Sequence, residues 1–259
     1  MFKIKILFGR NNEVNRVDWV VKQLESIERG SRILDAGAGE LRNKPYCSHL
    51  VYVSQDFCQY KGRGDGAALQ TGKWDTTGID IASDITSIPA PDASFDAVVC
   101  TEVFEHVPDP VAAMTELARL VRPGGRVVLT VPFCSLTHFA PYHFSSGLSR
   151  YWFETHLHDL GFIEIKAVPN GGWLDYVAQE IWRLPWIGGT YSSKALGWTA
   201  LVLALPLLFI MRLMKFRDKG SHELLTFGWQ VTAKKSEHHS EYVRSSRNQF
   251  TSIQTRESS

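Results

Sequence analysis

The chain opens with a segment whose apolar positions recur at the spacing of a helix. Within residues 14–30 the apolar side chains lie three or four positions apart or side by side, and Gly30 follows the last of them. These side chains are Val17, Val20, Val21, Leu24 and Ile27. The pattern predicts an amphipathic helix that ends at Gly30.

Three short runs rich in β-branched residues come next, and each ends in a polar or glycine-rich turn. They read RILDAGAG, HLVYVSQD and FDAVVCTE. Short apolar runs bounded by turns are typical of strands buried on both faces of a parallel sheet. We therefore expect three buried parallel strands.

The alternation continues through the next part of the chain. Asp109-Pro110 is a good helix start, VAAMTELARLV carries an apolar face, and PGG is expected to stop the helix. A strand over RVVLTVPF, a helix that ends at Gly161 and a strand over FIEIKAV follow. Alternating strands and helices predict an α/β fold with a mainly parallel sheet.

Residues 172–222 break this rhythm. They hold four tryptophans and the uncharged run ALGWTALVLALPLLFIM, and the tryptophans are Trp173, Trp182, Trp186 and Trp198. The segment TFGWQVTAKK then predicts one more strand, and the polar tail from Ser236 is expected to be disordered. The predicted organisation is a core over 1–171, an apolar insertion over 172–222, a final core strand over 223–235 and a tail over 236–259.

Composition limits the classes of function. The chain has 259 residues, 44% of them hydrophobic, and a formal net charge of +1. This suits one large domain with an extension and gives no basis for bulk nucleic-acid binding. The cysteines are scattered without a C-x-x-C pair, which predicts reduced thiols in a cytoplasmic protein: they are Cys47, Cys58, Cys100 and Cys134.

Candidate chemistry lies at the predicted strand ends, because ligands of open α/β sheets bind at the carboxyl ends of the strands. The first strand ends in Asp35, and Gly37 and Gly39 let the backbone approach a ligand closely. Asp56 ends the second strand, where an acid can bind ribose hydroxyls, and Asp84 follows GIDIAS. In the alternative, purely structural interpretation, the glycines serve only a tight turn, Asp56 is a helix cap and Asp84 is a turn residue.

A nicotinamide cofactor does not fit this pattern. Its fingerprint G-x-G-x-x-G has a third glycine, and Arg42 stands in that position. An acid before the glycines suits a cofactor that carries an amino group and no phosphate. S-adenosylmethionine is such a cofactor.

From Ile33 to Val168 the sequence resembles the class I S-adenosylmethionine-dependent methyltransferases, particularly the type 11 group. The motifs are LDAGAGE, VSQDFC, SDITSIPAPDASFDAVVCTEVFEHV and LVRPGGRVVLTVP, in that order. The resemblance implies a Rossmann-like doubly wound sheet, mainly parallel, with an antiparallel last strand. The apolar helical insertion would lie directly before that strand.

The resemblance also implies a cofactor site at the strand ends, made of Asp35, Gly37, Gly39, Asp56, Phe57, Asp84, Ile85, Thr101 and Glu102. Asp35 and the two glycines would line the methionine half. Asp56 would bind the ribose and Phe57 would lie against the adenine. Asp84 would accept from the adenine amino group, the Ile85 backbone would contact the ring, and the last two residues would lie under the cofactor.

Two features depart from the family pattern. Leu41 stands where many members have a third small residue, which suggests a tighter turn. The stretch between residues 59 and 78 is longer than usual. The sequence assigns it no role, and a lid and a substrate loop are the two roles left open.

The segment TEVFEHV supports two hypotheses. In the structural one, Glu105 bonds neighbouring backbone and His106 packs under the cofactor floor. In the other, the spacing E-x-x-E-H resembles the metal-binding segment of ubiquinone-pathway O-methyltransferases and of small-RNA 3′-end methyltransferases. Glu102, Glu105 and His106, with His143 as a guessed fourth ligand, would then hold Mg²⁺ or another divalent ion against a substrate hydroxyl.

Catalysis is expected on the substrate side of this segment. His143 follows the fifth core strand and is the best candidate for a general base, with Glu105 and His106 beside it. The other interpretation makes His143 a surface-loop histidine. His138 has the same two interpretations with weaker support.

The apolar run over residues 195–211 has seventeen residues, the lower limit for a membrane span, and Arg212, Lys215 and Arg217 follow it. A single crossing would separate the last strand from its sheet. Pro206 and the nearby tryptophans therefore favour an in-plane or hairpin association with a membrane surface. A buried or dimer-forming helix and a true span are the alternatives.

The sequence thus predicts a cytoplasmic methyltransferase, peripheral on the inner face of a membrane if the run binds lipid. It would methylate a hydroxyl of a small-molecule, glycan or lipid-linked acceptor, without a nucleic-acid partner. The rival functions are a nicotinamide-dependent oxidoreductase or sugar-nucleotide enzyme, and a non-catalytic binding protein with the methyltransferase fold. Oligomeric state is left open.

Overall fold

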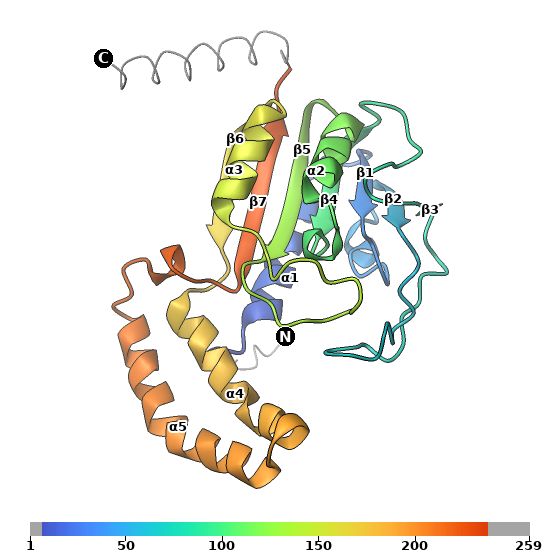
Figure 1. The fold of residues 1–259 in the computed structure, drawn as a ribbon. Coiled ribbons are helices and arrows are strands. Elements are labelled where there is room, and N and C mark those ends of the chain that lie inside the picture. Colours follow the sequence, from blue (N-terminus) through green and yellow to red (C-terminus); the bar gives the residue numbers. More distant parts are fainter. Residues whose placement is uncertain (1–6, 238–259) are drawn as a thin grey trace, which may run out of the picture.

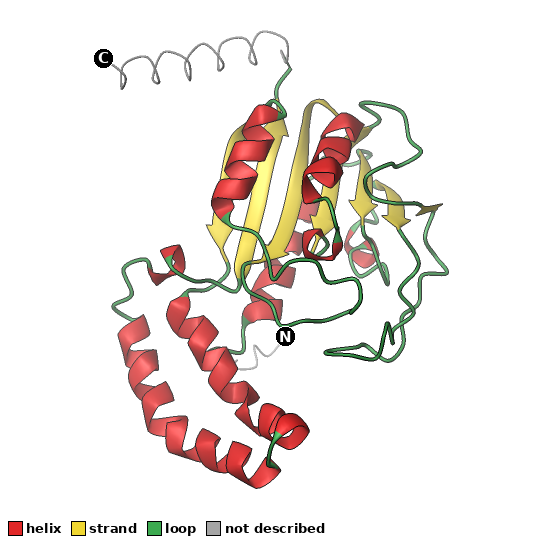
Figure 2. Cartoon of the chain, in the orientation of Figure 1, coloured by secondary structure: helices red, strands yellow, loops and turns green. Residues whose placement is uncertain are grey.

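The computed structural model describes residues 7–237 (Figures 1 and 2). The tail that was predicted to be disordered, 236–259, lies outside these residues except for its first two. A seven-stranded sheet forms the centre, in the order β3-β2-β1-β4-β5-β7-β6. Its strands are β1 (Arg32–Ala36), β2 (Val51–Asp56), β3 (Ile81–Ala82), β4 (Phe95–Thr101), β5 (Val121–Pro132), β6 (Phe162–Pro169) and β7 (Gly228–Lys235).

The strand directions confirm the predicted fold class. All pairs from β3 through β5 are parallel, whereas β7 is antiparallel to both β5 and β6. The carboxyl ends of the parallel strands therefore meet along one side of the sheet, and we call this side the carboxyl edge. This is the edge at which the candidate cofactor residues were expected.

Helices cover both faces of the sheet (Figure 2). The helices of the core are α1 (Asn12–Glu25), α2 (Pro110–Leu120) and α3 (Arg150–Asp159), and short 3₁₀ turns are η1 (Lys44–Tyr46), η2 (Phe104–His106) and η3 (Ser221–Glu223). Alternate strand residues point to opposite faces. Accordingly, Ile33 packs with α1 on one side, and its neighbour Leu34 packs with α2 and α3 on the other.

Two predicted helix ends need correction. The first helix ends at Glu25, five residues before Gly30, which lies in the following turn with a φ of 82°. Helix α2 starts as predicted, since Asp109 Oδ1 accepts from the Ala112 N–H at 2.9 Å, but it ends at Leu120, before PGG. The PGG segment instead belongs to β5, where the pairing with β4 shifts register.

The apolar insertion forms an antiparallel helical hairpin, α4 (Trp173–Tyr191) and α5 (Lys194–Lys215), which extends beyond the carboxyl edge (Figure 1). The two helices approach closely where Gly188 meets Gly197. A Cβ on Gly188 would lie only 2.7 Å from the Gly197 Cα, so the contact requires a glycine there. Trp182 donates to the Phe8 carbonyl at 2.9 Å and joins α4 to the core.

Candidate cofactor and acceptor site

The strand register brings the three predicted acids to one edge. Asp35 is paired with Ser54, and Asp56 with Ala82, so Asp35, Asp56 and Asp84 follow one another along the carboxyl edge. This is the arrangement that a cofactor lying across the strand ends requires.

Asp35 is buried and already has partners. Its carboxylate accepts from the Tyr52 hydroxyl at 2.6 Å and from Asn43 Nδ2 at 3.1 Å. Burial raises the pKa of Asp35 to about 6, although these two hydrogen bonds act in the opposite direction. In this structure Asp35 therefore holds the turn after β1 in place.

The turn after β1 requires its glycines. Gly37 and Gly39 have φ values of 71° and 51°, a region that residues with a Cβ rarely adopt. A Cβ on Gly37 would also lie 2.4 Å from Val103. Leu41 in the same turn has a φ of 60°, which agrees with the tighter turn predicted there.

Asp56 and Asp84 differ in their surroundings. Buried Asp56 accepts from the Gly39 N–H at 3.0 Å and from the Cys58 N–H at 2.8 Å, and so joins the ends of β1 and β2. Exposed Asp84 accepts from the Thr86 N–H at 2.8 Å, as a turn residue does. Buried Ile85 packs in the core beside it.

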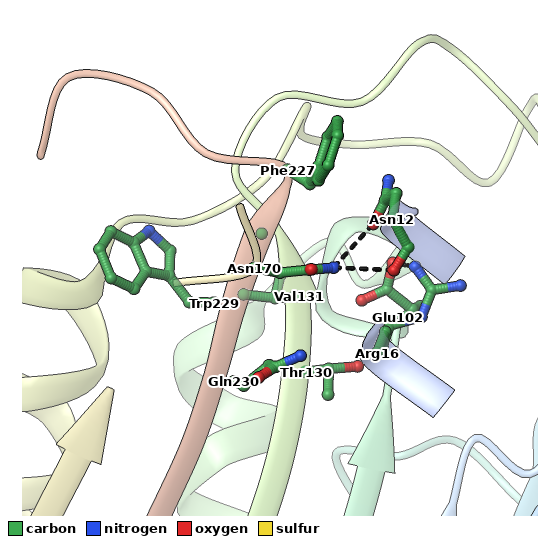
Figure 3. A pocket seen from close by; sticks show the side chains of 10 residues that line it. Asn12, Arg16, Glu102, Thr130, Val131, Asn170, Phe227, Trp229 and Gln230 are labelled. Atoms are coloured by element: carbon green, nitrogen blue, oxygen red, sulfur yellow. Dashed lines mark hydrogen bonds and ion pairs between the residues drawn. The ribbon is translucent and has the colours of Figure 1, made fainter. Parts of the chain in front are cut away.

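Thr101 ends β4, and Glu102 directly follows it. Glu102 has a φ of 55°, and its carboxylate accepts from Arg16 of α1 at 2.8 Å. The pair borders a small polar pocket between α1 and strands β5 and β7 (Figure 3). In it, Asn170 donates to Asn12 Oδ1 at 2.8 Å.

These pocket residues were missed by the sequence reasoning. Asn12 and Arg16 precede the first strand, and Asn170 and Gln230 lie far along the chain. They are ordinary polar residues outside any motif, so no sequence signal distinguishes them.

Two loops close the carboxyl edge. The stretch over 59–78 pairs with the loop after β5, since Leu69 and His138 form a β-bridge and the Phe139 N–H donates to the Leu69 carbonyl at 2.9 Å. Phe139 stacks on Tyr60 with ring centroids 4.5 Å apart. Trp74 of the same stretch lies over Gly39. Phe57, the predicted adenine neighbour, packs against Tyr142 of the second loop.

Glu105 is the most unusual residue of the site. It is fully buried in η2, and neither carboxylate oxygen has a hydrogen-bond partner among the described residues. Burial, reinforced by the neighbouring Glu102 carboxylate, raises the pKa of Glu105 well above its usual range. A buried carboxyl without a partner is costly, which points to a group that completes its environment.

Two imidazoles, His106 and His138, lie beside this carboxyl, and His143 lies beside those two rings. We call Glu105 and these three histidines the histidine cluster. One nitrogen of each ring lies within 4.8 Å of the others. His106 Nε2 is 3.7 Å and His138 Nε2 is 3.9 Å from Glu105 Oε1, too far for hydrogen bonds.

The tautomers of two rings are fixed by backbone carbonyls. His106 Nδ1 donates to Tyr142 O at 2.5 Å, and His138 Nδ1 donates to Leu136 O at 2.8 Å. Burial lowers the pKa of His106 to about 4. The pKa of His143 is also lowered, mainly by burial and to a lesser extent by the charge of neighbouring His138. With their Nδ1 atoms bonded to these carbonyls, His106 and His138 both direct Nε2 toward Glu105, the arrangement that a metal ligand needs.

Glu102 lies outside this cluster, because its carboxylate pairs with Arg16. Of the four predicted ligands, the structure thus brings together Glu105, His106 and His143. It adds His138, a weaker candidate than His143 in the sequence analysis.

Residues 34–129 match the family Methyltransf_11, described as a methyltransferase domain. This segment, residues 34–129, belongs to the type 11 group of class I S-adenosylmethionine-dependent methyltransferases. The matched segment contains the acids of the first three strand ends and the segment TEVFEHV. The predicted family, enzyme class and S-adenosylmethionine cofactor are confirmed, against the nicotinamide and non-catalytic alternatives. The roles of the single residues stay predictions.

Curated methyltransferases are similar to this chain. An uncharacterized methyltransferase of Bacillus subtilis, YcgJ, is 29% identical over 72% of this chain and 80% of its own. A ubiquinone biosynthesis O-methyltransferase of Dechloromonas aromatica is 34% identical over 44% of this chain and 49% of its own. A demethylmenaquinone methyltransferase of Renibacterium salmoninarum is 36% identical over 39% of this chain and 40% of its own. The chain spans about half or less of the length of these last two relatives.

Proposed function

We propose that this methyltransferase acts on a hydroxyl group that is held beside the histidine cluster. The observation that carries the proposal is the buried, unpartnered Glu105 carboxyl with the Nε2 atoms of His106 and His138 facing it. Such a group of bases next to the cofactor edge suits an acceptor whose proton must be removed. An amine or thiol acceptor has less need of it.

The cofactor supplies a methyl group on a sulfonium, and the enzyme's part is mainly to place the acceptor oxygen in line with it. Asp56 would bind the ribose, and Gly37 and Gly39 would leave room for the methionine half. His143 is the best candidate for the base, since one of its ring nitrogens has no partner in the described structure. The pKa of His143 is lowered as well, but that of His106, at about 4, makes His106 a weak base and a neutral ligand near pH 7.

A divalent ion would find donors in the histidine cluster. His106, His138 and His143 each offer one nitrogen. The Glu105 carboxylate, beside His106 and His138, could supply an oxygen. When bound, such an ion would lower the pKa of an acceptor hydroxyl. Three imidazoles favour a transition ion such as Zn²⁺ over Mg²⁺, which prefers oxygen ligands, so the expected ion changes from the one suggested by E-x-x-E-H.

Metal analysis tests the proposed ion site in the histidine cluster and needs no methyl acceptor. We expect purified protein dialysed against Zn²⁺ to retain about one ion per chain. Glu105→Gln together with His138→Asn should retain none, while Glu102→Gln should retain it. Equal retention by all three proteins would contradict the proposed donors and leave the structural hypothesis.

The acceptor class is tested by methyl transfer. Protein incubated with radiolabelled S-adenosylmethionine and candidate hydroxyl compounds should transfer the label to the hydroxyl compound. The labelled methyl group should then resist mild base, as a methyl ether does. His143→Asn should lower the rate by about 10²-fold or more if His143 is the base. Label that enters only carboxyl or amino groups would overturn O-methylation.

A further inference from the structure

Helix α5 has an apolar surface on almost every side. It is 22 residues long with a mean hydropathy of 2.0 in its most apolar window, yet only 22% of that window is buried. The core helix of a soluble protein of this composition would be mostly buried. The exposed apolar residues are Leu196, Trp198, Val202, Leu203, Leu205, Leu207, Phe209, Ile210, Leu213 and Met214. Contiguous apolar surfaces of this kind mark interaction sites.

Only one stripe of α5 has a partner. Leu201, Leu208 and Met211 are buried against α4, where they meet Leu174 and Ala178. These α5 positions lie on one helical face, and most of the remaining positions of the helix are exposed. Helix α4 therefore covers too little of α5 to explain its composition.

Charge is confined to the two ends of helix α5. No charged residue lies between Lys194 and Arg212, a run of about 25 Å at 1.5 Å per residue. The base of the hairpin carries exposed cations at Arg212, Arg217 and Lys219. This order, an apolar body followed by exposed cations, is complementary to a bilayer with anionic headgroups.

Aromatic residues of the interfacial type lie toward the free end. Trp186 and Tyr191 of α4 contact each other edge-on, with ring centroids 6.3 Å apart, and both are exposed. Trp198 of α5 is exposed as well. Tryptophan and tyrosine concentrate where membrane and water meet.

The topology excludes a single membrane crossing. Strand β7, which follows the hairpin, lies between β5 and β6 and pairs with both. Both ends of the hairpin are therefore on the side of the sheet. An apolar run longer than one leaflet, about 15 Å, must then enter obliquely or lie along the surface.

The hairpin is fixed to the loops that carry the histidine cluster. The Tyr176 hydroxyl of α4 donates to the Cys134 carbonyl at 3.0 Å, at the start of the loop with His138 and His143. Figure 1 shows the hairpin extending from the carboxyl edge. A bilayer that holds α5 would therefore face the edge where the acceptor is methylated.

We propose that the α4–α5 hairpin is a monotopic anchor in a lipid bilayer, with its basic end at anionic headgroups. The enzyme then takes its acceptor from the membrane as a hydroxyl compound with a lipid anchor. The anchor itself is independent of the methyl transfer, whereas the lipid-linked acceptor rests on the proposed function. Attachment to the inner face of a membrane would agree with the predicted localisation.

Liposome flotation of the full chain tests the anchor. Wild-type protein should float with vesicles of phosphatidylcholine and phosphatidylglycerol, and less with phosphatidylcholine alone. Replacing exposed Leu203, Leu207 and Phe209 with serine should lower the bound fraction at least about tenfold. Arg212→Gln and Arg217→Gln should each weaken binding to the anionic vesicles by about fivefold.

A matched variant controls for the loss of exposed apolar residues. This variant has serine in place of three exposed apolar residues on the surface of the sheet domain, away from α5: Val51, Val111 and Tyr151. It should float like wild type. Affinity for S-adenosylhomocysteine, measured by calorimetry, should be unchanged within about twofold in the α5 variant, since none of its three residues touches the candidate cofactor site.

Two results would overturn the anchor. One is wild-type protein that stays with the soluble fraction at both lipid compositions. The other is a wild-type dimer that the α5 variant converts to a monomer without any change in flotation, which would make α5 a surface for a second copy of this chain.

The acceptor is tested separately. Vesicles of a natural total lipid extract with radiolabelled S-adenosylmethionine should yield label in the organic phase, and the α5 variant should lose most of it. Label found only in water-soluble compounds, at equal rates for both proteins, would overturn the lipid-linked acceptor and leave methyl transfer intact. Failure to bind S-adenosylhomocysteine would instead count against the proposed function, whatever the flotation result.

Discussion

Glu105 shows at the scale of one residue how burial turns an ordinary side chain into a chemical group. Its carboxyl is buried, and imidazole nitrogens of His106 and His138 lie 3.7 and 3.9 Å away. At those distances the carboxyl gains little from hydrogen bonding and still bears the cost of desolvation. A bound ion or ordered acceptor group would remove this cost, which is why the cluster is the centre of the proposed chemistry.

His106 should make the stability of the metal-free protein depend on pH. Its folded-state pKa of about 4 lies below the ordinary 6.5, so the unfolded chain binds the proton more tightly. The contribution is fully present above pH 6.5 and is lost as the pH falls from there toward 4. Its upper limit is about 3 kcal/mol. His106→Asn can keep a donor near Tyr142 O and should flatten this part of the profile.

Urea unfolding of both proteins at several pH values between 4 and 7.5 measures the effect. The difference between wild type and variant isolates His106 from other titrating groups. Parallel stability profiles of the two proteins would show that His106 is protonated normally in the folded chain.

Asp56 should determine cofactor affinity. Asp56→Ala removes the charged acceptor proposed for the ribose hydroxyls and should weaken S-adenosylhomocysteine binding by about 1–3 kcal/mol. Calorimetry measures the affinity, and Asp159→Ala, an exposed acid on α3, is the control. Because Asp56 also accepts from Gly39 and Cys58, the variant's thermal stability must be measured alongside. Unchanged affinity in a folded variant would remove the ribose assignment.

At the scale of elements, the two glycines of α4 near its end have different roles. A Cβ on Gly188 would meet the Gly197 backbone at 2.7 Å, whereas a Cβ on Gly189 would meet only Lys194 at 3.8 Å. Gly188→Ala should therefore push the helices apart and cost about 1–3 kcal/mol of hairpin stability. Gly189→Ala should be neutral or stabilise the helix by up to about 1 kcal/mol.

Hydrogen exchange of the α4 and α5 amides reports on the hairpin directly. Faster exchange in Gly188→Ala and unchanged or slower exchange in Gly189→Ala are expected. If both variants exchange alike, the close approach of the two helices is not what holds the hairpin together.

The paired loops are a second feature at this scale. The stretch over 59–78 and the loop after β5 share backbone hydrogen bonds and an aromatic group around Phe139. Phe139 also stacks on His106 with ring centroids 5.1 Å apart. A movement of either loop would therefore be transmitted to the histidine cluster, as a lid or substrate loop requires. The lid role itself stays a prediction.

At the scale of the whole molecule, the hairpin is an insertion whose two ends lie next to each other. It leaves the sheet after β6 and returns before β7, and the Asn170 N–H donates to the Gly228 carbonyl while the Phe227 N–H donates to the Asn170 carbonyl. Replacing residues 173–222 with a short Gly-Ser linker should therefore leave the sheet intact. Loop closure of this kind costs little because the ends already lie together.

We expect the shortened protein to fold and to bind S-adenosylhomocysteine within about tenfold of wild type. Some affinity is lost because α4 touches α1 and the N-terminal segment, where Trp182 donates to Phe8. Circular dichroism and calorimetry check the two expectations. An unfolded product would show that the hairpin is part of the core.

The sequence alone determined the sheet and the place of its cofactor edge. Short apolar runs, helix starts such as Asp109-Pro110 and the glycine turn after β1 are local signals, and local steric and hydrophobic rules suffice to interpret them. The acids at the strand ends followed, because parallel strands must end at the same edge. The helix end at Gly30 was wrong, since a glycine in the next turn gives a similar signal.

Only the tertiary structure decided which side chains meet. Arg16 removes Glu102 from the predicted ligand set, His138 joins it, and Asn170 reaches Asn12 across the molecule. The structure also showed that α5 is mostly exposed. Composition alone cannot distinguish an exposed apolar helix from a buried one. The physical reason is that contacts between distant segments depend on how helices and loops pack on the sheet. The pattern along the chain records only whether a residue favours water or the interior.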